Sequence, residues 1–299
     1  MSKIVLTLKQ QPTVPLEAEV LSPDTFADLS NDEIRAKIVY HGKRQCRLDD
    51  FFDVEGERSD ELELHGDLHR VRWIGRAMSR GRITVHGSVG MHLGAYMRGG
   101  EIEVHGDASD WIGAEMRRGL IRVHGNGGGQ IGAGYRGSLK GMRNGTIIID
   151  GSAGLEVGMR MRRGTIVIGG PAKDFTGLQM KGGTIVLLSG AEIRTGAWMV
   201  RGTIISLVPL PMLPTFSYAC QYTPSFLKVY SRQLKQLGVT LPVATDEGAY
   251  HLYSGDAAVP GKGEILVWDP SPDSRIGQIQ DGRKFGRCAS RDTRSDRRQ

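Results

Sequence analysis

A unit of 19 residues recurs along the middle of this chain and limits the folds that are open to it. The methionines display it most simply, with spacings of 19, 19, 26, 19, 19 and 19 residues: Met78, Met97, Met116, Met142, Met161, Met180 and Met199. A glycine follows each of them three residues later, and an isoleucine follows that glycine by two: Ile83, Ile102, Ile121, Ile147, Ile166, Ile185 and Ile204. Such self-similarity predicts a repeat architecture.

The unit is too short for most repeat folds. After the glycine that follows each methionine, apolar residues alternate with others, as in Ile102-Glu103-Val104, which predicts a short strand with one buried face. Nineteen residues are too few for two helices and a turn, and a propeller blade needs about twice that length. We therefore predict a mainly β fold, a single-stranded parallel (right-handed) β-helix of about seven coils stacked at about 4.8 Å. The methionine and isoleucine columns should fill its interior.

The flanking segments lack the repeat and predict other structure. Residues 1–65 contain the strand-like stretches "KIVLTL" and "KIVYHG", and "LSNDEI" places Ser30 and Glu33 as a capping box. We expect a small α+β N-terminal cap over 1–65, ending in an incomplete first coil at Leu64-His65-Gly66. The glycine-rich β-helix should occupy 66–208, a helix with short strands 209–271, and a disordered basic tail 272–299.

Four coils carry an apolar stripe on a nominally outward face, at Ile148, Val167, Val186 and Ile205. Something must cover it. The stretch "TPSFLKVYSRQLKQLG" predicts a helix with Thr223 as N-cap, Pro224 at the first position and Gly238 as the stop. One face of this helix is apolar: Leu227, Tyr230, Leu234 and Leu237. We expect the helix to pack on the stripe; coverage by another protein chain is the alternative.

The repeat region is also the basic part of the chain, since residues 66–207 hold 19 Lys and Arg against 10 Asp and Glu. The residue after the ladder methionine is a cation in five consecutive coils: Arg98, Arg117, Arg143, Arg162 and Lys181. Stacked cations repel one another unless anions answer them. Three interpretations stay open: a well-solvated edge, pairing with Glu115 and other local acids, or a dock for an extended polyanion or an acidic partner.

Other motifs give weaker predictions. His65, His86, His105 and His124 lie near one column, but no carboxylate column accompanies them, so we expect a surface histidine ladder and no shared metal. The GxGxxG match in the 26-residue gap lacks a βαβ context, which argues against dinucleotide binding. We expect a seven-residue excursion that projects like a thumb and meets partners. No nucleophile–base pair, carboxylate pair or metal cluster is evident, so the chain itself should lack catalytic residues.

Composition excludes some locations and partners. No run of about 18 apolar residues predicts a membrane span, and the N-terminus lacks the features of a signal peptide. Cys46, Cys220 and Cys288 are far apart, which favours isolated thiols in a reducing cytoplasm. We expect a cytoplasmic protein without a nucleic-acid partner.

The coil text over 106–170, the entry "VYHGKRQCRLDDFFDVEGE" and the exit "LPMLPTFSYACQYTPSFLKVYSRQL" together resemble a known family. It is the GXGXG β-helix shared by the C-terminal domain of glutamate synthase large subunits and by the C subunit of formylmethanofuran dehydrogenase. The three stretches favour the dehydrogenase type, and the resemblance spans about residues 35–240.

The resemblance implies a scaffold in one-carbon metabolism. Members occur in a tungsten- or molybdenum-dependent dehydrogenase that fixes CO2 onto methanofuran, and in a bacterial formyltransferase/hydrolase complex that uses tetrahydromethanopterin and a methanofuran analogue. We favour the bacterial setting. Zinc and the tungsten or molybdenum pterin would lie on partner proteins, which the resemblance gives as amidohydrolase-like, pterin-protein-like and formyltransferase-like. The family's carrier bears a glutamate-rich side chain, and we expect this side chain as an anionic ligand of the basic row, although no family motif maps onto the row. The alternatives are a standalone glutamate-synthase-type spacer and a polyanion-binding module acting alone.

Overall fold

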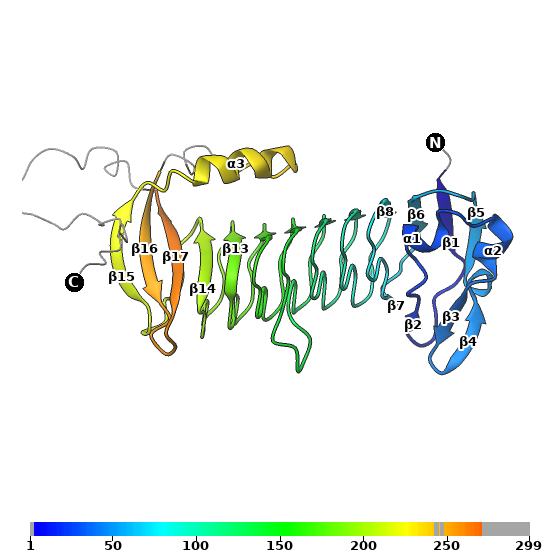
Figure 1. Cartoon of the computed structure of the whole chain (residues 1–299), viewed down its shortest axis with the longest axis horizontal. Helices are drawn as coiled ribbons and strands as arrows, with labels where there is room; N and C mark the ends of the chain where they lie inside the picture. The colour runs from blue at the N-terminus through cyan, green and yellow to red at the C-terminus, as the bar shows by residue number, and fades with distance from the viewer. Residues whose placement is uncertain (1–2, 242–244, 246–247, 271–299) are drawn as a thin grey trace, which may run out of the picture.

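The computed structural model describes residues 3–241, 245 and 248–270, and the protein is a long rod built mainly of strands (Figure 1). Most strands belong to one 13-stranded sheet, in the order β15-β16-β17-β14-β13-β12-β11-β10-β9-β8-β6-β1-β5. The seven strands of the repeat run along the middle of this sheet in chain order: β8 (Arg82–Val85), β9 (Glu101–Val104), β10 (Leu120–Val123), β11 (Thr146–Ile149), β12 (Thr165–Ile168), β13 (Lys181–Leu187) and β14 (Arg201–Ser206). The architecture is β-helix-like; its hand and its number of coils stay predictions.

The register between neighbouring strands places like residues on like. Each strand of the repeat pairs in parallel with the next, and the isoleucines face one another in a continuous row from Ile83 to Ile204. A second line of bridges on another side of the coils runs from Leu68 through Val89 and Ala108 to Ala191. The ladder isoleucines and methionines are fully buried. The interior therefore consists of stacked columns, as the repeat predicts.

The N-terminal segment extends the same sheet. The strand β6 (Glu61–His65) pairs in parallel with β8, so the chain at Leu64-His65-Gly66 does continue the stack, and β1 (Ile4–Leu8) pairs in parallel with β6. The antiparallel strand β5 (Phe52–Glu55) covers the edge of β1. A four-stranded sheet stands beside them, in the order β4 (Arg44–Arg47), β3 (Ile38–His41), β2 (Leu16–Glu17) and β7 (Val71–Arg72).

Three short helical segments complete this end: α1 (Pro23–Phe26), α2 (Asn31–Arg35) and the 3-10 turn η1 (Leu48–Asp50). The predicted capping box stands at the start of α2, where the Ser30 backbone N–H donates to Glu33 Oε2 at 2.9 Å. The strand predictions for "KIVLTL" and "KIVYHG" correspond to β1 and β3.

The C-terminal end is closed by β15 (Ser217–Tyr222), β16 (Ala249–Gly255) and β17 (Lys262–Asp269). The strand β17 adds in parallel to β14, and β16 and β15 follow in antiparallel pairing, with β15 at the edge of the sheet. The helix α3 (Leu227–Gln236) runs parallel to the long axis of the rod and across the direction of its strands (Figure 1). Its buried Leu227 and Leu234 share an apolar cluster with the outward stripe: Ile148, Val167, Val186 and Ile205.

The packing of the helix is thus as predicted, but its start is not. The residue before its first turn is Phe226, and Thr223 does not cap it. The Leu227 N–H donates to Pro224 O at 3.1 Å, so the chain makes a three-residue turn before the helix begins. No helix among the described residues has the length and hydropathy of a membrane-spanning segment. The predicted tail, 272–299, lies outside the described residues.

Candidate functional site

The five predicted basic residues form one row across consecutive coils. The backbone N–H of each donates to the methionine carbonyl of the preceding coil at 2.7–2.8 Å, as Arg98 does to Met78 and Lys181 to Met161. Coil stacking thus sets the spacing of the row at about 4.8 Å. The structure brings all five together: Arg98, Arg117, Arg143, Arg162 and Lys181.

No carboxylate among the described residues pairs with this row. Arg98, Arg117 and Arg162 are exposed, and the Lys181 ammonium contacts only a carbonyl oxygen, that of Leu139 at 3.4 Å. Glu115, the expected local partner, instead accepts a hydrogen bond from the backbone N–H of Tyr135 at 3.4 Å. The Nε atom of Arg143 is buried without a hydrogen-bond partner. Pairing with local acids is therefore not found among the described residues, and a solvated edge and a dock stay open as interpretations of the row.

The 26-residue gap forms a loop between β10 and β11 that projects from the rod (Figure 1). We call residues 133–141 the thumb. Tyr135 anchors it, because the Tyr135 ring stacks on Trp111 at a centroid distance of 4.7 Å. The Tyr135 hydroxyl also lies 2.9 Å from Nδ1 of His92. Burial raises the pKa of Tyr135 and lowers the pKa of His92, so a neutral phenol and a neutral imidazole share this hydrogen bond.

Two hollows lie against the thumb. One of about 770 Å³ is lined by residues of four coils and of the thumb itself: Met91, His92, Asp110, Trp111, Gln130, Tyr135, Arg136, Gly137, Glu156, Met159 and Arg160. The other, of about 400 Å³, combines exposed apolar side chains with the end of the basic row: Leu139, Arg160, Gln179, Lys181, Trp198, Val200 and Val259. The thumb and the basic row are therefore parts of one surface.

Sequence reasoning missed the aromatic anchor of the thumb. Trp73, His92 and Trp111 each stand five residues before a repeated methionine in three consecutive coils, and this recurrence was the available signal. Their rings are stacked, with Trp73 and His92 at 4.1 Å and His92 and Trp111 at 6.5 Å. Tyr135 carries no repeat signal, since the thumb interrupts the period.

The four histidines form the expected stacked row, with neighbouring ring centroids 4.4, 5.2 and 5.2 Å apart. No carboxylate column was predicted beside them, and the column is interrupted, but two single glutamates do accompany the histidines. Glu63 lies beside His65 and His86, and Glu103 lies beside His105 and His124, in two groups whose donor atoms could hold a metal ion. The signal was the pattern Glu-x-His at 63–65 and 103–105, which places both side chains on the same face of a strand.

Comparison with known proteins gives consistent similarities. The family model described as the GXGXG motif matches residues 66–209. The C subunit of the tungsten-containing formylmethanofuran dehydrogenase 2 of Methanothermobacter thermautotrophicus is 45% identical over 100 residues, which are 32% of this chain and 37% of that protein. The C subunit of the molybdenum-containing formylmethanofuran dehydrogenase 1 of Methanosarcina barkeri is 40% identical over 98 residues, 31% of this chain and 33% of that protein. The chain spans about a third of the length of these curated relatives.

A solved structure is similar over a greater length. A chain of the formyltransferase/hydrolase complex (FhcABCD) from Methylorubrum extorquens, whose X-ray structure is in complex with methylofuran, matches with a TM-score of 0.82 at 32% identity. The match covers 88% of the present chain and 98% of the other. It therefore extends beyond the coils to both ends of the rod.

Proposed function

The chain belongs to the GXGXG β-helix family that includes the C subunit of formylmethanofuran dehydrogenases, and from this membership we propose that it is the scaffold of a formyltransferase/hydrolase complex. The observation that carries the proposal is the match over 98% of a chain of such a complex, against about a third of the dehydrogenase relatives. In this setting the complex takes a formyl group from a pterin carrier to a methanofuran-type carrier and releases formate, in the cytoplasm.

The chemistry would belong to the partners. An amidohydrolase-like protein with zinc, a pterin-protein-like protein and a formyltransferase-like protein would assemble on the rod, and in a dehydrogenase the tungsten or molybdenum pterin would also lie on a partner. This chain supplies a stiff surface, because its buried columns are close-packed and repeat at a fixed spacing.

The basic row is the proposed dock for the anionic side chain of the carrier. Two unit charges about 5 Å apart repel by about 1 kcal/mol even in water, and the five cations of the row form four such neighbouring pairs. No described carboxylate relieves this repulsion. An extended chain of carboxylates would do so, with charge-assisted hydrogen bonds to Arg98, Arg117 and Arg162.

The docking proposal is tested by charge reversal in the assembled complex. We expect Arg117→Glu with Arg162→Glu to weaken binding of fluorescent polyglutamate at least tenfold and to flatten its dependence on salt. Arg44→Glu, on the exposed face of β4, is the matched control and should bind normally. Unchanged affinity in the double variant would remove the dock and leave the scaffold proposal intact.

The thumb is the proposed contact with a partner protein. Leu139, on the thumb, exposes 65% of its surface beside Trp198 and Val200, and such apolar groups gather at protein interfaces. We expect Leu139→Asp to reduce recovery of the partner proteins in a size-exclusion complex. Val229 on α3 is equally exposed, at 65%, so Val229→Asp is the control; α3 and the thumb lie on opposite sides of the rod (Figure 1).

Purification of the tagged chain from its native cell tests the scaffold proposal itself. Recovery of an amidohydrolase-like partner supports the formyltransferase/hydrolase setting. Recovery of a flavin-binding synthase instead would support the glutamate-synthase-type spacer and overturn the proposal.

A further inference from the structure

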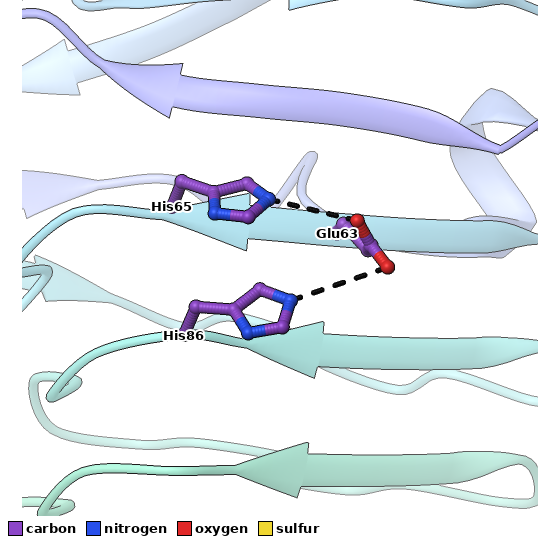
Figure 2. Close-up of side chains that lie close together, drawn as sticks. All are labelled: Glu63, His65 and His86. Atoms are coloured by element: carbon purple, nitrogen blue, oxygen red, sulfur yellow. Dashed lines mark ion pairs between the residues drawn. The ribbon is translucent and has the colours of Figure 1, made fainter.

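Three side chains at the N-terminal end of the histidine row direct donor atoms toward one another (Figure 2). Glu63 and His65 belong to β6, and His86 directly follows β8. The Glu63 carboxylate lies 3.5 Å from Nε2 of His65 and 4.0 Å from Nε2 of His86. All three donor atoms are within 4.8 Å of one another.

The backbone holds this arrangement in place. The strands β6 and β8 pair in parallel with Leu64 beside Val85, and the His86 N–H donates to Leu64 O at 2.9 Å. The two imidazole rings are nearly parallel, at 14°, with centroids 4.4 Å apart. Since Glu63 and His65 are two residues apart on one strand, both point to the same face. Little backbone freedom would be lost on binding an ion.

The donor set matches a particular class of ion. Two imidazole nitrogens and a carboxylate oxygen suit zinc and the neighbouring divalent transition metals, with water completing the coordination. Bonds of about 2.0–2.1 Å in a tetrahedral site place donors about 3.3 Å apart. The two distances from Glu63 exceed this by less than 1 Å, the two imidazole nitrogens lie within 4.8 Å of each other, and rotation of the exposed side chains would close the gap. The side chains are 23–39% exposed, so the site is open to ions from solvent.

Competing charges distinguish this group from its neighbour. The Lys3 ammonium lies 2.7 Å from Oε1 of Glu63 at the exposed surface, and an incoming ion would displace it. In the second group both nitrogens of His124 are engaged, with Asp150 at 2.8 Å and Glu103 at 3.0 Å. Arg82 also lies 2.7 Å from Glu103. The second group is therefore an internally satisfied ion-pair network.

We propose that Glu63, His65 and His86 bind one divalent ion of the zinc class, which braces β6 against the first strand of the repeat. The brace lies where the chain enters the repeated coils. It is independent of the proposed function, since it involves neither the basic row nor the thumb.

The test uses the full-length, tag-free chain and the metal alone. Titration with ZnCl2 followed by calorimetry, and with CoCl2 followed by visible absorption, should give one ion per chain. We expect His65→Ala, His86→Ala and Glu63→Gln each to weaken binding at least tenfold. His69→Ala is the matched control, because this histidine pairs with Asp67 outside the row.

Lys3→Ala gives the opposite sign. Removal of the competing Lys3 ammonium should tighten the binding of zinc. If Glu63 were not a zinc ligand, loss of its ion pair with Lys3 would leave the affinity for zinc unchanged. Zinc should also raise the Tm of the wild type and of His69→Ala, but not that of Glu63→Gln, and circular dichroism verifies that each variant is folded. Wild-type affinity in His65→Ala and His86→Ala, or no binding by the wild type, overturns the proposal.

Discussion

The substitution Gly113→Ala gives the most direct test of the stacked interior, because Gly113, three residues before Met116, lies against the isoleucine ladder. Gly113 has φ +60°, and a Cβ atom built on it would lie 2.5 Å from Cδ1 of Ile147 and 3.3 Å from Cδ1 of Ile121. Both isoleucines are fully buried in the ladder. The neighbours therefore have no free space into which to move.

Two effects set the magnitude. A Cβ in the left-handed region costs about 1–2 kcal/mol, and an extra methyl in a packed core costs about 1–3 kcal/mol. The free energy of unfolding should fall by roughly 2–5 kcal/mol in total. Since 1 kcal/mol shifts the Tm of a domain of this size by about 2–4 °C, the packing effect alone corresponds to roughly 2–12 °C.

Gly137→Ala separates the two effects. Gly137, in the thumb, has φ +84° and nothing within 4 Å of the added Cβ, so it keeps the backbone strain without the clash. In thermal unfolding followed by circular dichroism, the Tm of Gly113→Ala should lie below the Tm of Gly137→Ala by the amount that corresponds to the packing effect. If both variants melt at the same temperature, Ile147 does not pack beneath Gly113, and the stacked register is wrong.

Two further predictions concern α3 and the thumb. Leu234 is 2% exposed, so Leu234→Ala should destabilise the packing of α3 by about 2–5 kcal/mol, whereas Val229→Ala should change it by less than about 0.5 kcal/mol. The loss should be seen as faster amide exchange in α3 of Leu234→Ala, and equal exchange in the two variants would contradict this. Burial lowers the pKa of His92, so the stability that neutral His92 contributes is present above its unfolded pKa of about 6.5 and is lost as the pH falls from there toward the lowered pKa. The Tm should therefore fall more between pH 7 and pH 5 in the wild type than in His92→Gln, and an equal fall would refute the role of His92.

The period of the sequence was sufficient to predict most of the rod. A repeat of constant length places equivalent residues one above another, so the isoleucine row and the outward stripe could be predicted without knowledge of long-range contacts. The apolar face of α3 could then be matched to the stripe by its spacing alone. The start of α3 could not be predicted in this way. Thr223 and Pro224 are local signals for a helix start, but Phe226 packs in the cluster around the stripe, and a turn therefore precedes the helix.

Features that break the period were harder to predict. The thumb lies outside the repeat, and its anchor depends on one tyrosine reaching a column of aromatic residues that begins three coils earlier. The carboxylates beside the histidines were missed for another reason. The prediction rested on an unbroken column of carboxylates, and Thr84 and Arg122 interrupt that column. A metal site needs donor atoms from only two neighbouring coils.

Stacking brings each outward side chain beside those of the next coil, and cations elsewhere on the rod meet a carboxylate of that coil. Arg82 pairs with Glu103, and Arg122 pairs with Asp150. The basic row lacks such partners among the described residues, so its cations only repel one another. Arg117→Glu should therefore leave the Tm unchanged or raise it, whereas Arg122→Glu should lower it by placing a carboxylate beside Asp150. A loss of polyglutamate binding in Arg117→Glu at an undiminished Tm would then report on the dock itself and not on the fold.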